Sequence, residues 1–308
     1  MSEGAVSEGA VSEGAVSDGG PQVVHDKDAF RARCDEARAA GARVGLVPTM
    51  GALHAGHLSL VEEARRRGCD HVAVTIFVNP LQFAPTDDFD RYPRTLEDDV
   101  ARCRSAGVQT VFAPTMESMY PPGFSTHVEV EGVTQPLEGR FRAGHFRGVT
   151  TVVTKLFMLA GPCTAVFGRK DYQQWRTLAR MALDLDMPIE VVGAPIVREA
   201  DGLALSSRNR YLSADERKRA LALVEGLRAA WDAFAAGERD PEVLLPLARD
   251  GVAARFDRVD YVALADPDTL APAADDAHLP ERALLAGAAH LGETRLIDNV
   301  VLGQDPRP

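Results

Sequence analysis

Residues 48–57 read PTMGALHAGH, and their position constrains the fold more than any other feature of the chain. An apolar stretch precedes them at residues 44–47, and an amphipathic stretch follows at residues 58–67. This order predicts a buried strand, a glycine-containing loop and a helix. A loop that leads into a helix N-terminus offers backbone N–H groups and a partial positive charge, which is where a phosphate can bind.

Two histidines lie at the start of the predicted helix. His54 and His57 are three residues apart, so they share one helix face. Imidazoles in this place can donate hydrogen bonds to phosphate oxygens as negative charge develops. The helix N-terminus also lowers their pKa, which favours neutral donors. A capping pair and a metal-binding pair remain alternatives at this spacing.

Composition excludes several classes of protein. The 308 residues suffice for one large or two moderate domains. The formal net charge of −11 argues against a nucleic-acid partner. No apolar run reaches the roughly 18 residues of a membrane helix, so we expect no membrane partner. The cysteines show no metal-type pairing and no export signal precedes them, so we expect reduced thiols and a cytoplasmic protein.

The first residues form a short repeat. SEGAV at residues 2–6 recurs at 7–11 and 12–16. A five-residue period fits neither a helix nor a strand, so residues 1–20 are predicted to be a disordered tail.

Apolar strands alternate with helical patterns through residues 21–194. The expected strands are residues 43–47, 71–78, 109–112, 163–167 and 189–192, and the expected helices are residues 26–40, 57–67, 96–106, 149–159 and 172–183. This alternation predicts an α/β domain with a doubly wound parallel sheet. Its ligands are expected beyond the carboxyl ends of the strands.

The pattern changes near residue 195. Ser213 and Glu216 form a capping box that opens a long helix through about residue 236, and a second helix is expected at residues 241–256. Short strands follow at residues 260–264, 282–289 and 294–301, with Gly292 in the last turn. Residues 195–308 are therefore predicted to be a smaller α+β domain, with a hinge near residue 195 that lets it act as a lid.

Polar segments follow two further strands. Asn79 and Gln82 could hold a small polar substrate through their amides, although Asn-Pro also favours a simple turn. Lys170 offers a mobile positive charge to a triphosphate, and Gln174 lies four residues later on the same side. Asp171 between them could serve only as a helix cap.

Three more segments allow two interpretations each. Ser206, Ser207 and Arg208 suit phosphate oxygens, or form a solvated loop. The basic, glycine-bearing residues 139–147 could cover an anionic ligand, or form an ordinary surface loop. Asp98 and Asp99 could lie near Mg²⁺, or simply complement a helix dipole.

Together these motifs resemble the pantothenate synthetase (pantoate–β-alanine ligase) family of the HIGH-type nucleotidyltransferase superfamily. The resemblance covers about residues 22–303 and is carried by residues 48–54, 77–83, 92–95, 167–174 and 197–209. It implies a Rossmann-like fold and a cytoplasmic homodimer. It also implies an enzyme that uses ATP and Mg²⁺ to join pantoate to β-alanine through a pantoyl-adenylate, with release of AMP and pyrophosphate.

The resemblance also implies residue roles. His57 would donate a proton to phosphate with His54 beside it, and Lys170, Ser206, Ser207 and Arg208 would stabilise the developing charge. The implied ATP-binding residues are Met50, Gly51, Ala52, Leu53, His54, Ala55, Gly56, His57, Gly168, Arg169, Lys170, Asp171, Val197, Leu205, Ser206, Ser207 and Arg208. Gln82 and Gln174 would hold pantoate, and Gln82 would also border the β-alanine position. Asn79 and Arg142 would complete the pocket, and Asp98 with Asp99 would lie near Mg²⁺.

The chain departs from the family pattern at Leu205, where methionine is frequent, and at Arg169, where an acidic residue is frequent. Three rival functions remain at this stage. They are an adenylyltransferase that acts on a phosphorylated cofactor precursor, an aminoacyl-tRNA synthetase relative, and a nucleotide sensor without catalysis. The acidic charge and the lack of a basic anticodon-binding domain weigh against the second.

Overall fold

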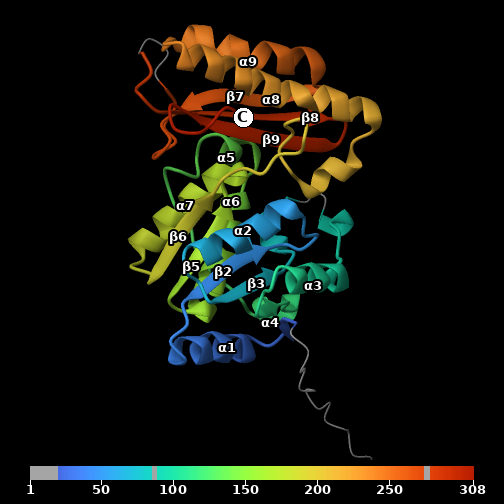
Figure 1. Cartoon of the computed structure of the whole chain (residues 1–308), viewed down its shortest axis with the longest axis vertical. Helices are drawn as coiled ribbons and strands as arrows, with labels where there is room; N and C mark the ends of the chain where they lie inside the picture. Colours follow the sequence, from blue (N-terminus) through green and yellow to red (C-terminus); the bar gives the residue numbers. More distant parts are fainter. Residues whose placement is uncertain (1–19, 85–88, 274–277) are drawn as a thin grey trace, which may run out of the picture.

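The computed structural model describes residues 20–84, 89–273 and 278–308. They form a six-stranded sheet and a three-stranded sheet, drawn in the lower and upper parts of Figure 1. The tail predicted at residues 1–20 lies outside the described residues, except for Gly20. None of the described helices is long and apolar enough to cross a membrane.

The larger sheet is parallel throughout. Its strands are β1 (Gln22–Val24), β2 (Val44–Thr49), β3 (His71–Ile76), β4 (Thr110–Phe112), β5 (Cys163–Gly168) and β6 (Ile189–Ala194), in the spatial order β1-β4-β3-β2-β5-β6. Each strand predicted for this region is confirmed. The strand β1 was not predicted, because three residues at a sheet edge carry no readable period.

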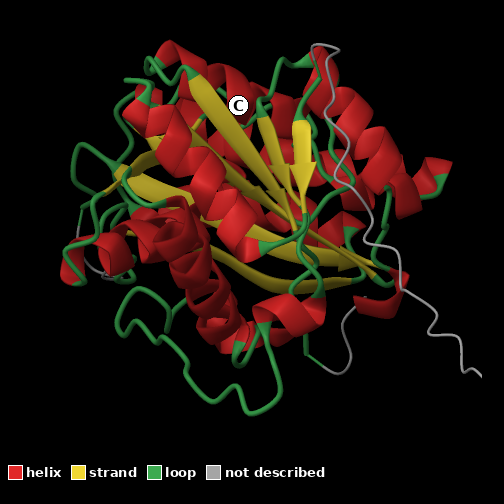
Figure 2. Ribbon diagram, turned by 90° about the horizontal axis from the view of Figure 1, so that it is seen from below, coloured by secondary structure: helices red, strands yellow, loops and turns green. Residues whose placement is uncertain are grey.

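Helices cover both faces of this sheet (Figure 2). The helices α1 (Lys27–Ala39), α6 (His145–Ala160) and α7 (Tyr172–Asp184) share one apolar cluster with the strands. The helices α2 (Ala55–Arg66) and α3 (Leu96–Ser105) contribute to a second cluster. Burial on both faces explains why the strands are nearly continuous apolar runs.

The strand order reverses at β2. This strand pairs with β3 on one side and with β5 on the other, so the loops after β2 and β5 leave the sheet in different directions. Such a switch point opens a crevice at the carboxyl ends of the strands. The two most distinctive motifs of the sequence, residues 48–57 and 168–174, therefore meet at the switch point.

The basic segment at residues 139–147 is partly helical. It contains α5 (Glu138–Phe141) and the first turn of α6, which begins four residues before the prediction. Gly144 precedes α6 with φ 77°, a left-handed conformation that glycine adopts without strain. The remaining short elements are α4 (Met116–Met119) and the 3₁₀ turns η1 (Pro80–Gln82), η2 (Phe89–Arg91), η3 (Arg169–Asp171) and η4 (Ser207–Tyr211).

The smaller sheet is antiparallel and consists of β7 (Arg258–Ala265), β8 (Ala283–Leu291) and β9 (Thr294–Leu302). One face packs on α8 (Ala214–Ala235) and α9 (Pro241–Arg255). The other face packs on Leu137 and Tyr172, which belong to the part of the chain that carries the larger sheet. That part is called the first unit below, and the smaller sheet with its helices and the segment that leads to them is called the second unit. The predicted helices and strands of this region are confirmed. The domain boundary and the hinge near residue 195 stay predictions.

The capping box of α8 allows a stability test. Ser213 Oγ accepts from the Glu216 N–H at 3.3 Å, and the Glu216 carboxylate accepts from the Ser213 N–H at 2.8 Å. We expect Ser213→Ala to lower the free energy of unfolding by about 1 kcal/mol, measured by urea denaturation. Ser105→Ala, at the exposed end of α3, is the control and should change it by less than about 0.5 kcal/mol. Equal effects of the two changes would contradict the capping role.

Candidate functional site

A buried carboxylate fixes the loop after β2. The N–H groups of Ala52 and Leu53 donate to Asp99 Oδ2 and Oδ1 at 2.9 and 2.7 Å. Gly51 and Ala52 have φ values of 85° and 50°, and the Gly51 N–H donates to Thr49 Oγ1 at 3.2 Å. Asp99 is only 1% exposed. Its two oxygens therefore hold a left-handed turn that would otherwise be strained.

The two histidines cap the helix that follows. His54 Nδ1 accepts from the Gly56 N–H at 3.1 Å, and His57 Nδ1 accepts from the His54 N–H at 3.2 Å. The two rings lie 4.0 Å apart between centroids. A Cβ at Gly56 would lie 2.9 Å from His54 Cε1, so glycine is needed for the ring to fold over the backbone. The N-cap residue of α2 and the residue three positions later are thus both imidazoles.

These contacts change the role expected for the loop. The loop amides were expected to be free, and this is wrong for six of them, which donate within the protein: Gly51, Ala52, Leu53, His54, Gly56 and His57. That this loop binds ATP stays a prediction. The same hydrogen bonds assign the tautomer of both rings, because a neutral imidazole whose Nδ1 accepts carries its proton on Nε2. The Nε2–H groups are therefore the donors that the loop offers to an anion.

Burial keeps both rings neutral. It lowers the pKa of His54 to about 3, with further lowering by the charges of His57 and Lys170. It lowers the pKa of His57 to about 4, where nearby Asp171 opposes and Lys170 assists the shift. The predicted direction of the shift agrees, although burial rather than the helix N-terminus is the main cause. At neutral pH each ring is therefore neutral and has one N–H to donate.

The turn after β5 lies beside the histidines, since the charges of Lys170 and Asp171 act on both rings. Asp171 makes no capping hydrogen bond to α7, so the alternative that it is only a helix cap fails. Arg169 instead points to the second sheet, where Nη1 lies 2.7 Å from Asp305 Oδ1. Its guanidinium is engaged in this ion pair, and its part in ATP binding stays a prediction.

The segment from 197 to 208 approaches the histidine loop from the second unit. The Leu205 N–H donates to Val197 O at 2.9 Å, and a Cβ at Gly56 would lie 3.7 Å from Leu205 Cβ. Ser206 Oγ accepts from the Arg208 N–H at 3.3 Å. Ser206, Arg208, Lys170, Asp171 and Arg142 line one cavity of about 1070 Å³. The structure thus brings parts of the predicted segments 168–171 and 205–208 to one cavity, with the histidine loop next to them rather than in its lining.

Asn79 is a buried support rather than an exposed ligand. Its Nδ2 donates to Gln82 Oε1 at 3.0 Å and to Gly148 O at 3.1 Å. Its Oδ1 accepts from Tyr120 Oη at 2.7 Å and from the Leu81 N–H at 3.3 Å. The direct substrate contact predicted for Asn79 is therefore not supported, because its amide is saturated. Asn79 fixes the orientation of Gln82 instead.

No site role was predicted for His145. Its Nδ1 donates to Gln82 O at 2.9 Å, and its Nε2 accepts from Arg142 Nη1 at 3.0 Å. Burial, followed by the charge of Arg142, lowers its pKa to about 4, which suits a neutral ring with one donor and one acceptor. Its place in the basic segment at residues 139–147 was the available signal.

Predicted substrate residues lie beside the hydrogen bonds that join Arg142 through His145 to Gln82. Gln174, Lys170 and Arg142 line a narrow cavity of about 30 Å³ together with His145. The Gln174 side chain has no hydrogen-bond partner among the residues that the structure describes. Gln82 reaches the histidine loop, where Nε2 lies 3.3 Å from Met50 Sδ. Gln174 thus shares a cavity with Lys170, as predicted, whereas the substrate contacts of both glutamines stay predictions.

The two aspartates predicted near Mg²⁺ lie in different environments. Asp99 is the buried anchor of the loop, whereas Asp98 is exposed in the first turn of α3. Within residues 20–84, 89–273 and 278–308, no group of three or more His, Cys, Asp or Glu side chains could hold a metal ion. A Mg²⁺ ion usually takes one or two carboxylates and completes its coordination with phosphates and water.

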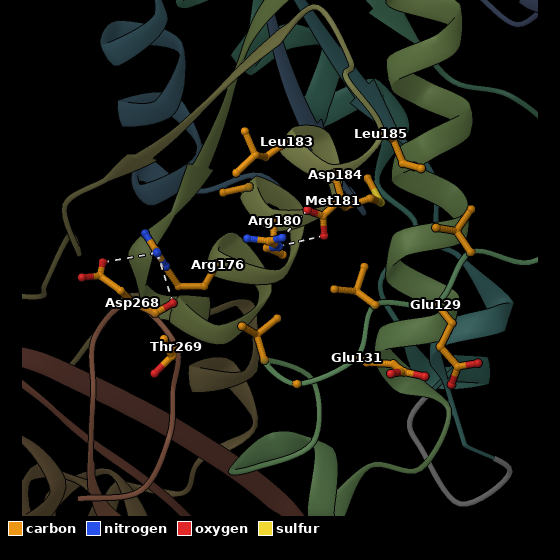
Figure 3. A pocket seen from close by; sticks show the side chains of 15 residues that line it. Glu129, Glu131, Arg176, Arg180, Met181, Leu183, Asp184, Leu185, Asp268 and Thr269 are labelled. Carbon is orange, nitrogen blue, oxygen red and sulfur yellow. Dashed lines mark hydrogen bonds and ion pairs between the residues drawn. The ribbon is translucent and has the colours of Figure 1, made fainter.

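A third cavity, of about 710 Å³, lies beside α7 (Figure 3). Its lining includes Glu129 and Glu131, and its arginines are already paired, Arg176 with Asp268 and Arg180 with Asp184. No predicted site residue lines it. The cavity of about 1070 Å³ that Lys170, Arg142, Ser206 and Arg208 line is therefore the candidate active site, and the histidine loop adjoins it through Lys170.

The fold defines a class: an α/β protein with a doubly wound parallel sheet, in which ligands bind at the switch point. Residues 22–301 match the family model described as Pantoate-beta-alanine ligase. The chain belongs to the pantoate–β-alanine ligase family.

Relatives and solved structures agree with this assignment. The chain is 55% identical to "Pantothenate synthetase" of Anaeromyxobacter dehalogenans, over 91% of this chain and 98% of the relative. Its fold is similar to pantothenate synthetase from Thermus thermophilus, with a TM-score of 0.84, 46% identity, and coverage of 91% and 98%. It is also similar to pantoate-beta-alanine ligase from Francisella tularensis complexed with beta-gamma ATP and beta-alanine, with a TM-score of 0.74, 29% identity, and coverage of 94% and 100%.

Asp99 and its neighbour Asp98 allow a stability test that compares a buried carboxylate with an exposed one. We expect Asp99→Asn to lower the free energy of unfolding by about 2 kcal/mol, since an amide NH₂ would face a backbone N–H and leave it unpaired. The matched control Asp98→Asn should change it by less than about 0.5 kcal/mol. Denaturant unfolding measures both, and a loss of stability in the control alone would refute the assignment.

The neutral histidines make stability depend on pH. His57 has a pKa of about 4 when folded and 6.5 as the ordinary value, so only the unfolded chain binds a proton between them. The stabilisation is complete above pH 6.5 and is lost as the pH falls toward 4. We expect His57→Gln to weaken the fall of unfolding free energy between pH 6.5 and about 4, measured by urea titrations. Parallel pH curves for the two proteins would exclude a buried neutral His57.

Proposed function

We propose that the chain is a pantoate–β-alanine ligase that activates pantoate as an adenylate and transfers it to β-alanine. The observation that carries this proposal is the pair of neutral imidazoles at the sheet switch point, with Lys170 beside them. The family membership and the relatives' names support the choice of substrates. The similar Francisella tularensis ligase, complexed with beta-gamma ATP, supports ATP as the nucleotide.

In the first step, the pantoate carboxylate attacks the α-phosphorus of ATP, and pyrophosphate leaves. Negative charge builds up on the phosphoryl oxygens as the bond to the leaving group breaks. The Nε2–H groups of His54 and His57 would donate to these oxygens, and Lys170 would add a positive charge. Donors fixed before the reaction are effective because they need no reorganisation in the transition state. Ser206, Ser207 and Arg208 would approach the phosphates from the second unit.

In the second step, the β-alanine amine attacks the acyl carbon of the adenylate, and AMP leaves. Gln82 would hold pantoate from one side and Gln174 from the other, with Gln82 also bordering the amine position. Arg142 would contribute its positive charge to a carboxylate. Closure of the second unit would exclude water, which otherwise hydrolyses the mixed anhydride.

Mg²⁺ would supply charge neutralisation on the phosphates. The exposed carboxylate of Asp98 suits a hard cation that arrives with the nucleotide, whereas Asp99 would act indirectly by holding the loop. A cytoplasmic homodimer completes the proposal. The exposed side chains of Leu183 and Leu185, beside the cavity of Figure 3, support a contact between copies.

Isotope exchange tests the adenylate. We expect labelled pyrophosphate to enter ATP in the presence of pantoate and Mg²⁺ without β-alanine, because the first step alone is reversible. His57→Gln should slow this exchange about 100-fold or more, the usual cost of one lost donor to a developing charge. Mass spectrometry of the complete reaction should find pantothenate and AMP. Exchange that requires β-alanine would rule out the adenylate, and a dinucleotide product would favour an adenylyltransferase.

A further inference from the structure

Glu138 links the two sheets through buried charge. The residue begins α5 and is 8% exposed. Its carboxylate accepts from both Nη atoms of Arg295 in β9, at 2.6 and 2.8 Å, and from Tyr261 Oη in β7, at 2.7 Å. Arg295 Nε donates further to Asp260 Oδ2 at 2.8 Å. A two-pronged guanidinium–carboxylate pair fixes direction as well as distance, so α5 is tied to the strands in one orientation.

The link is charged at neutral pH. Burial alone would raise the pKa of Glu138, but the hydrogen bonds and charge of Arg295 outweigh it and keep that pKa below its ordinary value. Burial and the charge of Glu138 raise the pKa of Tyr261, so the phenol remains a neutral donor. Removal of one member would leave its partner buried and uncompensated.

The backbone around Glu138 is strained and tightly held. Leu137 has φ 49°, which is uncommon for a residue other than glycine. A Cβ on Gly139 would lie 1.8 Å from Thr134 O, so only glycine fits there. The Glu138 N–H donates to Oε1 of the buried Gln173 at 2.9 Å. Strain of this kind persists only where the surroundings hold it, and it often accompanies function.

The other end of the link reaches the substrate pocket. The Arg142 N–H donates to Glu138 O at 2.9 Å. The Arg142 guanidinium also contributes to lowering the pKa of Glu138, so the two side chains are electrostatic neighbours. From Arg142 the contacts continue through the His145 ring to Gln82 O. A chain of direct contacts therefore joins Arg295 in the second sheet to Gln82 in the first unit.

The strand β9 also contacts the turn that carries Lys170, the other cation of the pocket. Asn299, four residues after Arg295 in β9, donates from Nδ2 to Lys170 O at 2.9 Å. Residues four apart in a strand lie on one face. One face of β9 thus contacts both the Lys170 turn and the α5 segment that carries Arg142.

We infer that Glu138 is a positioning residue that places Arg142 for a carboxylate substrate through its pair with Arg295. The pocket for the acid substrates is then complete only when the smaller sheet is docked on α5. This inference rests on the proposed function, because it takes the ligand of Arg142 to be pantoate or β-alanine. No catalytic contact by Glu138 itself is required.

Steady-state kinetics test the inference. We expect Glu138→Gln to raise KM for pantoate or β-alanine about tenfold, which corresponds to one misplaced charge-assisted hydrogen bond, while KM for ATP stays within about twofold. Glu63→Gln is the matched control. Glu63 is 6% exposed and pairs with Arg66 and Arg67 on α2, without a contact to Arg142. The control should leave all three KM values within about twofold.

A double-mutant cycle separates positioning from a general loss of structure. If Glu138 acts through Arg142, Glu138→Gln should cause no further rise in KM in an Arg142→Ala background, because coupled residues are not additive. The same rise in both backgrounds, or unchanged KM values in a folded Glu138→Gln protein, would overturn the inference.

Two further comparisons keep the test decisive. If Glu138→Gln does not fold, Tyr261→Phe, which removes a single hydrogen bond, should produce a smaller rise in the same KM, and no rise would count against the inference. Failure of the wild-type protein to form pantothenate would instead refute the proposed function. The two failures are thereby distinguishable.

Discussion

The site depends on the hydrogen bonds that the Nδ1 atoms of two imidazoles accept from the backbone. His54 and His57 each accept a backbone N–H at the start of α2, so each neutral ring keeps its proton on Nε2. Burial prevents protonation, and Asp99 holds the preceding turn in a conformation that brings both rings together. The helix start is thereby converted from an amide site for anions into a site whose donors are side chains.

The two units contribute different parts of the pocket. The segments after β2, β3 and β5 of the larger sheet supply the histidine loop, Gln82 and the Lys170 turn. The smaller sheet contacts the Lys170 turn through Asn299 and α5 through the pair of Arg295 with Glu138, and the segment that leads to it adds Ser206 and Arg208. The proposed closure of the second unit would therefore be coupled to catalysis, since Asn299 and Arg295 both lie on β9.

Much of this could be predicted from sequence. Alternating apolar runs indicated the parallel sheet, and the Ser213 capping box indicated α8. The short strand β1 was missed because three residues carry no period. Roles that depend on contacts between residues far apart in the chain could not be predicted from the sequence. Asp99 was predicted near a metal, yet it holds a backbone 46 residues away, and Asn79 was predicted as a ligand although its amide is saturated by neighbours.

The most direct test of the histidine donors is a long-range ¹H–¹⁵N correlation spectrum of the imidazole rings at neutral pH, with and without Mg-ATP. We expect His54 and His57 to be neutral, with the proton on Nε2, and both Nε2–H signals to shift when nucleotide binds. A charged ring, a proton on Nδ1 in the free protein, or nucleotide binding that leaves both signals unchanged would contradict this role.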